Sequence, residues 1–271
     1  MTAPARTYLF VPGDRPERFD KALASGADAV VLDLEDAVAP DDKARARDAV
    51  AKRLLASTPD ERARLVVRIN DESTASFDAD LALLKASNAA WVMLPKSERP
   101  ATVARVRAAC PEIAVLALIE TARGVLHAEA LAEAPGVSRL VFGTIDFALD
   151  LNLSGDPVGF DHAASVLALA SRAAGLAAPV AGVTPEIDDA APLLADLHRA
   201  RAHGFGAKLC IHPKQVALIH TALQPTAGEL DWARRVIAAA QDAPGAVQVD
   251  GRMVDKPVLQ RAHALLARAL R

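Results

Sequence analysis

Eight short apolar runs, separated by stretches with helical patterning, constrain the fold of this chain more than any other feature of its sequence. The runs occupy residues 7–13, 27–35, 64–70, 89–96, 114–120, 138–146, 177–183 and 207–213. Each is about one strand long, continuous rather than alternating, and rich in Val, Leu and Ile. This pattern indicates strands buried on both faces, as in a parallel sheet covered by helices. Helical patterning occupies residues 16–25, 41–56, 75–86, 100–109, 123–133, 160–174 and 187–203.

The number of strand–helix units favours a closed barrel. Eight such units predict an α/β fold of the (β/α)₈ TIM-barrel type, whose usual size is near ~250 residues. A doubly wound parallel sheet uses the same alternation and is the main alternative. Beyond the last unit, helical patterns at 226–242 and 256–270 flank a turn-like stretch. We therefore expect a barrel domain, 1–224, and a C-terminal helical extension, 225–271, that packs outside the barrel or against a neighbouring subunit.

Composition narrows the class of partner. Hydrophobic residues make up 52% of the chain and aromatic residues 4%, which favours helices packed on aliphatic strands. The net charge of −3 provides no basic surface for nucleic acid. No apolar run approaches the ~20 residues that cross a bilayer, and the N-terminal apolar stretch is too short for a signal peptide. Cys110 and Cys210 are expected to be buried thiols in a reducing, cytoplasmic setting.

Polar side chains gather at the carboxyl ends of the predicted strands, where barrels place their chemistry. Two neighbouring runs end in carboxylates, VLALIE at Glu120 and LVFGTID at Asp146. Buried carboxylates that lie close together repel each other, and a hard divalent cation removes that cost. Mg²⁺ prefers a few carboxylates and leaves positions for water and substrate oxygens, so the pair predicts a magnesium site. The alternative is that each carboxylate caps or ion-pairs with the following helix, for which Thr121 and Arg123 are available to Glu120.

The second run also ends in carboxylates, at Asp33, Glu35 and Asp36. We expect them to support the site by bonding metal-bound water or by orienting Arg68, although helix capping before 41–56 is the better interpretation for Asp36. Arg68 ends an apolar run, where an unpaired charge would be expensive. Its planar fork suits a carboxylate or a developing oxyanion, and a structural salt bridge to Asp33 or Glu35 is an equally good interpretation.

Other motifs are less specific. His212 is interpreted as a hydrogen-bonded histidine at a strand end, since no nucleophile is paired with it. Lys96 and Lys214 either meet an anionic substrate or are solvated. No GxGxxG follows a strand, and GxxxxGK[ST] and GxSxG are absent, which argues against dinucleotide, P-loop and nucleophile-elbow sites.

Several segments together resemble a known family. They are RTYLFVPGDRPERFDKALASGADAVVLDLEDAV, RIN, MLPK, ALIETARGVLHA, GTIDFALDL, KLCIHPKQ and VDGRMVDKPVLQRA. From Arg6 to about Ala264, the chain is similar to the citrate lyase β-subunit-like group, within the family of citrate lyase β chains and HpcH/HpaI-type aldolases. The combination of VPG, DLEDAV and a late DGRMVDKP is more specific than any single motif. The resemblance implies a TIM barrel, magnesium and acyl-CoA substrates.

The resemblance also implies roles for individual residues. Glu120 and Asp146 match the family's magnesium ligands, and Arg68 matches its substrate-binding arginine. Asp255 matches an aspartate that, in relatives acting on malyl-CoA and citramalyl-CoA, reaches a neighbouring subunit's site and acts there as acid or base. Relatives of this kind suggest a homotrimer.

The expected activity is that of a magnesium-dependent carbon–carbon lyase. It would cleave, or form, a 3-hydroxyacyl-CoA such as citramalyl-, malyl- or citryl-CoA, giving an acyl-CoA and a 2-oxo acid. Arg15 and Lys96 are candidate substrate contacts, Arg15 together with Arg18 for the CoA phosphates, with solvated helix positions as the alternative.

Two departures from the family pattern bear on the substrate. Ile145 stands where citrate lyase β chains commonly carry an acidic residue, which weakens the expectation of citryl-CoA. Asp36 stands where pyruvate-type aldolases carry a histidine, which argues against a CoA-free aldolase. A CoA-free, metal-dependent 2-oxo acid aldolase and a non-catalytic subunit of a larger complex are the alternatives.

Overall fold

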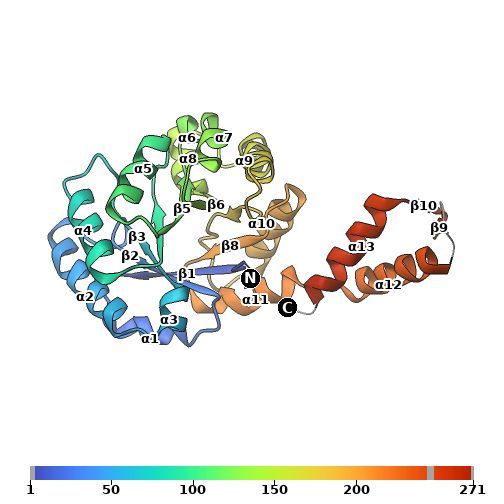
Figure 1. Cartoon of the computed structure of the whole chain (residues 1–271), viewed down its shortest axis with the longest axis horizontal. Helices are drawn as coiled ribbons and strands as arrows, with labels where there is room; N and C mark the ends of the chain where they lie inside the picture. The colour runs from blue at the N-terminus through green and yellow to red at the C-terminus, as the bar shows by residue number, and fades with distance from the viewer. Residues whose placement is uncertain (1–3, 243–246, 270–271) are drawn as a thin grey trace. The chain divides into compact units, whose positions relative to one another are not determined.

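The computed structural model describes residues 4–242 and 247–269. The chain forms two compact units, Pro4–Ile219 and the residues from His220 onward. In the first unit, eight parallel strands close into a barrel in the order β1 to β8 (Figure 1). The closure confirms the TIM barrel over the doubly wound sheet, which would leave two open edges. The strands are β1 (Thr7–Pro12), β2 (Ala29–Asp33), β3 (Leu65–Arg68), β4 (Trp91–Leu94), β5 (Ala114–Ile119), β6 (Val137–Phe142), β7 (Val180–Ala181) and β8 (Ala207–Cys210).

Helices cover the outside of this barrel (Figure 1). They are α1 (Phe19–Leu23), α2 (Lys43–Ala56), α3 (Pro59–Arg64), α4 (Phe77–Ser87), α5 (Pro100–Ala109), α6 (Ala122–Leu126), α7 (Ala128–Ala132), α8 (Thr144–Asp150), α9 (Asp161–Ala173), α10 (Ala190–Ala202) and α11 (Pro213–Leu223), with 3₁₀ turns η1 (Pro16–Arg18), η2 (Pro40–Asp42) and η3 (Pro157–Phe160). The local sequence explains where several of these helices begin. Proline opens α3 and α5, and Thr58 and Glu61 form a capping box on α3.

Alternate strand residues fill the barrel interior, as a period of two requires. The interior core consists of Tyr8, Ala29, Val31, Val66, Met93, Leu116, Leu118, Val141, Val180, Ala207 and Leu209. Counting two residues onward from Val31, Val66 and Leu118 gives Asp33, Arg68 and Glu120, which are all buried. The same alternation that builds the core therefore places three charged side chains at the carboxyl ends of the strands, the mouth of the barrel.

The opposite end of the barrel, its floor, also holds a charge. Arg139 has the same parity as Val141 and is 3% exposed. Its Nε donates to the carbonyl oxygen of Ala178, and its Nη1 donates to that of Ala5, each at 2.6 Å. Nη1 also donates to the Tyr8 hydroxyl at 3.2 Å. Backbone carbonyls and one phenol thus satisfy this buried guanidinium.

The second unit is a helical hairpin with a short β-ribbon. Helix α12 (Ala227–Asp242) packs on α13 (Lys256–Ala269), and β9 (Val247–Val249) pairs antiparallel with β10 (Arg252–Val254). Asp250 and Gly251 form the turn with φ of 51° and 74°, the left-handed pair that a two-residue hairpin favours. The unit has its own core, which comprises Ala233, Val236, Val254, Ala262 and Leu265.

One predicted strand end was wrong. The sixth run was read as a strand through Asp146, but β6 ends at Phe142 and Asp146 lies in the first turn of α8. Gly143 breaks the strand there. The division between the units lies inside α11, a little before the predicted boundary at 224. Both cysteines are buried free thiols, as predicted, and no described helix is long and apolar enough to cross a membrane.

Candidate active site

Arg68 is the centre of the charged cluster in the barrel mouth. It lies opposite Asp33 in the β2–β3 register, and its Nε and Nη2 donate to the two carboxylate oxygens of Asp33 at 2.7 and 2.6 Å. Its Nη1 lies 2.7 Å from Oε2 of Glu35 and 3.2 Å from Oδ2 of Asp36. The Phe10 ring packs 4.9 Å below the guanidinium carbon. Burial lowers the pKa of Arg68, but the hydrogen bonds and charge of Asp33 outweigh it and raise the pKa above its ordinary value.

The salt bridge considered for Arg68 is therefore present, and it includes a third carboxylate. Asp36 contacts Arg68 rather than a helix terminus, so the capping interpretation for Asp36 is wrong. The physical reason is that the chain first forms η2, and α2 begins only at Lys43, after Asp42. Asp33, Glu35 and Asp36 thus surround one guanidinium with negative charge.

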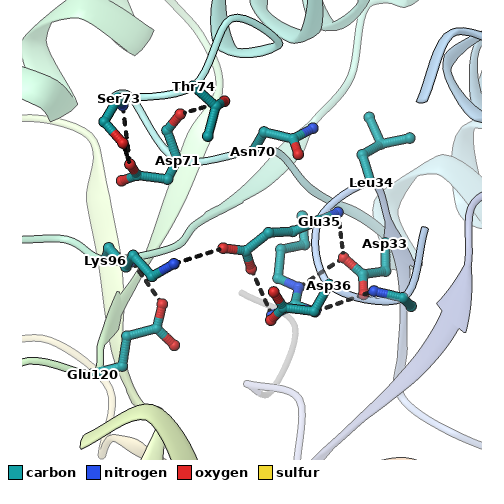
Figure 2. Close-up of polar contacts among 12 residues, drawn as sticks. Asp33, Leu34, Glu35, Asp36, Asn70, Asp71, Ser73, Thr74, Lys96 and Glu120 are labelled. Carbon is teal, nitrogen blue, oxygen red and sulfur yellow. Dashed lines mark hydrogen bonds and ion pairs between the residues drawn. The ribbon is translucent and has the colours of Figure 1, made fainter. Parts of the chain in front are cut away.

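Glu35 is buried, with 6% of its surface exposed, and extends into the mouth. Burial raises its pKa to about 7, although the charge of Arg68 opposes the shift. Its Oε1 lies 3.8 Å from the Nζ of Lys96. Figure 2 shows Lys96 between Glu35 and Glu120, with its ammonium directed to the former. A carboxyl with a pKa near neutrality at the mouth can hold or release a proton under physiological conditions.

Glu120 directly follows β5 and is 2% exposed. The backbone N–H of Lys96 donates to its Oε1 at 2.8 Å (Figure 2). Within the described residues, its Oε2 accepts no hydrogen bond. Burial, with the charges of Glu35 and Asp146, raises the pKa of Glu120 to about 8.

The alternative role considered for Glu120, helix capping or pairing with the following helix, is not the one observed. Thr121 is the N-cap of α6 and accepts from the Gly124 N–H at 3.1 Å. Arg123 lies 3.7 Å from Glu98 instead. Glu120 is therefore a buried carboxylate with one oxygen held by a backbone donor and one oxygen without a protein donor.

Asp146 comes from the next strand–helix connection, near enough for its charge to act on Glu120. It is half-buried in the first turn of α8, and its charge contributes to the raised pKa of Glu120. Its side chain makes no hydrogen bond or ion pair with other residues in the part of the chain that the structure describes. Gly143, between β6 and α8, allows the backbone at the start of α8 to pass close to the Glu120 side chain, since a Cβ at residue 143 would lie 2.6 Å from Oε2 of Glu120.

The donor set fits a hard divalent cation. Two carboxylates from neighbouring strand–helix connections each have oxygen atoms that no described protein donor uses, and the negative charge of Asp146 disfavours ionisation of Glu120 unless a cation is present. The residues described in the structure contain no cluster of three or more His, Cys, Asp and Glu side chains suited to a metal ion. A site with two protein carboxylates leaves positions for water and ligand oxygens, which is the mode that Mg²⁺ favours.

A polar pocket of about 410 Å³ opens beside the cluster. Its lining includes Glu35, Asp36, Lys96 and, from the β3–α4 connection, Asn70 and hydroxyl side chains. Figure 2 shows Asn70 and the 71–74 segment above Glu35 and Lys96. The pocket therefore offers room for a polar molecule next to Glu35, Asp36 and Lys96.

A model of the HpcH/HpaI aldolase/citrate lyase family matches residues 6–213, more than half of the chain. The chain belongs to the HpcH/HpaI aldolase/citrate lyase family. A second model, described as a C–C bond lyase of the TIM-barrel fold, matches residues 161–270. The resemblance noted in the sequence is confirmed.

Two relatives within or near this family match nearly the whole chain. The citrate lyase subunit β-like protein of Mycobacterium tuberculosis is 40% identical over 97% of this chain and 94% of its own length. The (3S)-malyl-CoA thioesterase of Cereibacter sphaeroides is 34% identical over 98% of this chain and 95% of its own length. Among solved structures, the M. tuberculosis protein CitE in complex with magnesium, acetoacetate and coenzyme A superposes with a TM-score of 0.89 at 39% identity, covering 99% of both chains.

The remaining predicted residues make other contacts than those of the Arg68 cluster in the part of the chain that the structure describes. Arg15 and Arg18 are 55% and 59% exposed, and each lies 3.9 Å from an acidic neighbour. His212 Nδ1 accepts from the backbone N–H of Lys214 at 3.2 Å, which agrees with a hydrogen-bonded strand-end histidine. Asp255 belongs to the second unit, where its Oδ1 accepts from the Val258 N–H at 3.0 Å and caps α13.

Sequence reasoning missed two contributors to the site. The first is the backbone N–H of Lys96, whose φ of 43° turns it toward Glu120; a left-handed non-glycine residue gives no clear signal in sequence. The second is Asp80 of α4, which is fully buried and accepts from the N–H and Nδ2 of Asn70 at 2.8 and 2.6 Å. An aspartate on the apolar face of a helix was the available signal, because such a residue needs a partner.

Proposed function

We propose that this protein is a magnesium-dependent carbon–carbon lyase acting on CoA esters. Its substrate would be a 3-hydroxyacyl-CoA such as citramalyl-, malyl- or citryl-CoA, cleaved to an acyl-CoA and a 2-oxo acid or formed from them. One observation carries the proposal: Glu120 and Asp146 are adjacent carboxylates with oxygens that no described protein donor occupies. Family membership, the CoA-thioester relative, and the neighbouring structure with magnesium, acetoacetate and coenzyme A support it.

Glu120 and Asp146 would hold the cation. When bound, Mg²⁺ supplies Lewis acidity toward the oxygens of a 2-hydroxy or 2-oxo carboxylate. The Lys96 N–H keeps Oε1 of Glu120 in place, so that Oε2 remains directed to the ligand. Arg68, oriented by Asp33, places a permanent positive charge where negative charge develops on the thioester oxygen as the C–C bond breaks.

The proton at the α-carbon requires an acid or base. We propose Asp255 of a neighbouring subunit for this role, within a homotrimer, because this aspartate lies between β10 and α13 of the second unit and is exposed. Arg15 and Lys96 are proposed to contact the CoA phosphates and the substrate carboxylate. A cytoplasmic location also stays a prediction.

The reaction is tested by incubating the protein with citramalyl-CoA, malyl-CoA and citryl-CoA in turn, with Mg²⁺ and with EDTA. A lyase releases a 2-oxo acid, which phenylhydrazine detects, and leaves the CoA thiol esterified. A thioesterase instead releases free thiol, which a disulfide reagent detects. Magnesium-dependent 2-oxo acid release from one of these esters is expected. Cleavage of free 2-hydroxy acids without CoA would overturn the proposal in favour of the aldolase alternative.

The role of Asp255 is tested by co-expressing Asp255→Asn with Glu120→Gln. Each variant alone is expected to be inactive. If Asp255 acts in a neighbouring subunit, mixed oligomers contain some sites with both residues intact, and partial activity returns. If both residues serve the same subunit's site, every site in the mixture lacks one of them and no activity returns.

A further inference from the structure

Lys208 is a buried lysine that the proposed reaction does not use. It lies within β8 between Ala207 and Leu209, which belong to the interior core, so its side chain points away from the interior. It is 2% exposed. Its Nζ donates to the carbonyl oxygen of Gly182 at 2.7 Å and lies 4.0 Å from Oδ2 of Asp196 on α10. A buried ammonium is costly, so a strand that keeps one there requires its partners.

Gly182, the partner of Lys208, directly follows β7 and packs against the start of α8. A Cβ at Gly182 would lie 2.4 Å from Oγ1 of Thr144 and 2.9 Å from the carbonyl oxygen of Phe142. Thr144 is the first residue of α8, and Asp146 follows it two positions later in the same turn. The backbone that Lys208 holds is therefore the surface against which the first turn of α8 rests.

The other side of α8's start rests on Glu120. The Gly143 N–H donates to the carbonyl oxygen of Ile119 at 2.8 Å, and a Cβ at Gly143 would lie 2.6 Å from Oε2 of Glu120. The chain from Phe142 to Asp146 is thus held between the end of β5 on one side and Gly182 on the other. Asp146 lies three residues after Gly143, in the segment that these two contacts hold.

The segment after β7 is also fixed by other side chains. Oγ1 of Thr184 donates to Asp196 at 2.6 Å, and Nε2 of Gln215 donates to the carbonyl oxygen of Thr184 at 2.9 Å. Thr184 and Gln215 are almost fully buried. Within this network, Lys208 provides the hydrogen bond to Gly182, the residue next to the start of α8.

We propose that Lys208 is a positioning residue for the carboxylate pair, acting through Gly182 and Thr144 to fix Asp146 beside Glu120. The inference deepens the proposed function, because it takes the pair to be a cation site. Two ligands from separate connections bind a cation well only when their separation is held by the surrounding structure. Without the ammonium, the Gly182 carbonyl loses its donor and the support for α8 loosens.

The test is metal affinity without substrate. Lys208→Met keeps much of the side-chain volume and removes the donor; Mn²⁺ and Mg²⁺ dissociation constants are measured by calorimetry and Mn²⁺ resonance on the full-length protein. A dissociation constant at least tenfold weaker than wild type is expected. Arg139→Met is the matched control, because it also removes a buried positive charge and lowers stability, but at the barrel floor. Its metal affinity is expected to stay within twofold of wild type.

A second variant keeps the test decisive if Lys208→Met does not fold. Gly182→Ala retains Lys208 but places a methyl group against Thr144, and it is expected to weaken metal binding by a similar factor. Unchanged affinity in whichever of the two variants folds, or an equal loss in Arg139→Met, overturns the positioning role. Failure of the proposed function looks different: wild type would then bind no Mn²⁺, or would bind it as tightly as Glu120→Gln does.

Discussion

Two arginines are buried inside the barrel, one at each end, and they are neutralised in different ways. Arg139 at the floor donates to backbone carbonyls and a phenol. Arg68 at the mouth contacts Asp33, Glu35 and Asp36. Backbone carbonyl groups carry no titratable proton, so the charge balance at the floor is fixed. Carboxylates respond to protons and cations, so the same residue type at the mouth belongs to a cluster whose charge can change.

The largest effect is expected at the mouth, from Glu120→Gln. The amide keeps the shape but removes the charge that would hold Mg²⁺. We expect kcat/KM to fall by about 10³-fold or more, roughly 4 kcal/mol of transition-state stabilisation. Metal affinity should fall as well, while metal-free protein at pH 8 should not lose thermal stability, since a buried carboxyl with a raised pKa is replaced by a neutral group.

The control for this substitution is Glu61→Gln, which removes an exposed capping-box carboxylate on α3. It should leave turnover unchanged and lower thermal stability only slightly. Wild-type turnover in Glu120→Gln would show that the mouth is not a cation site. The mouth would then differ from the floor only in the groups that contact its arginine.

At the floor, Arg139→Met should lower the free energy of unfolding by about 3 kcal/mol. The substitution leaves the carbonyl groups of Ala5 and Ala178 and the hydroxyl of buried Tyr8 without their donor. Each unsatisfied buried group costs roughly 1–3 kcal/mol, and the carbonyls that water can reach cost less. Urea unfolding measures the loss. Turnover per folded molecule should match wild type, because the floor lies at the far end of the barrel from the mouth; a tenfold fall in kcat/KM would contradict the division of roles.

Much of this architecture was predictable because it depends on period and register. Continuous apolar runs predicted eight strands, and alternation within them predicts that Asp33, Arg68 and Glu120 face the same interior. The error at Asp146 arose because apolar Ile145 follows Phe142 within three residues, and only Gly143 marks the end of the strand. The helix that follows is short, so it produces no periodic signal.

The contacts that link separate connections were not predictable in the same way. Lys208 and Arg139 interrupt apolar runs, which signals that each needs a partner, but their partners are backbone carbonyls of distant segments. Which carbonyl lies within reach depends on barrel closure and on glycines such as Gly182 that permit close approach. Sequence identifies such residues as expensive, and only the folded chain shows what neutralises them.

Arg68→Lys should produce a smaller loss than Glu120→Gln. A lysine retains the positive charge but cannot donate to both oxygens of Asp33 while lying against Glu35. We expect kcat/KM to fall about 30-fold, or roughly 2 kcal/mol, with most of the effect in kcat if the charge acts on the developing oxyanion. An effect confined to KM would show that Arg68 contributes only to substrate binding.

The smallest expected effect is a pH dependence of metal-free stability that comes from the mouth and not from the floor. The pKa values of Glu35 and Glu120 rise from 4.5 in the unfolded chain to about 7 and about 8 in the folded protein. The folded state therefore keeps protons that the unfolded state releases, so this contribution is complete below pH 4.5 and is lost as the pH rises through 7 to 8. In EDTA, calorimetry should show Tm falling between pH 5.5 and 8.5, by an amount equivalent to about 1–2 kcal/mol for wild type relative to Glu120→Gln.

Magnesium should oppose that fall, because a cation stabilises the ionised carboxylates that burial disfavours, and the stabilisation by added Mg²⁺ should be larger at pH 8.5 than at pH 5.5. Arg139→Met should keep the wild-type pH slope at a lower Tm, since it leaves Glu35 and Glu120 at the mouth unchanged. A wild-type Tm in EDTA that rises with pH over the same window, with Glu120→Gln following the same curve, would mean that the mouth carboxylates are already ionised and paired. The two ends of the barrel would then differ in ligand type but not in their capacity to change charge.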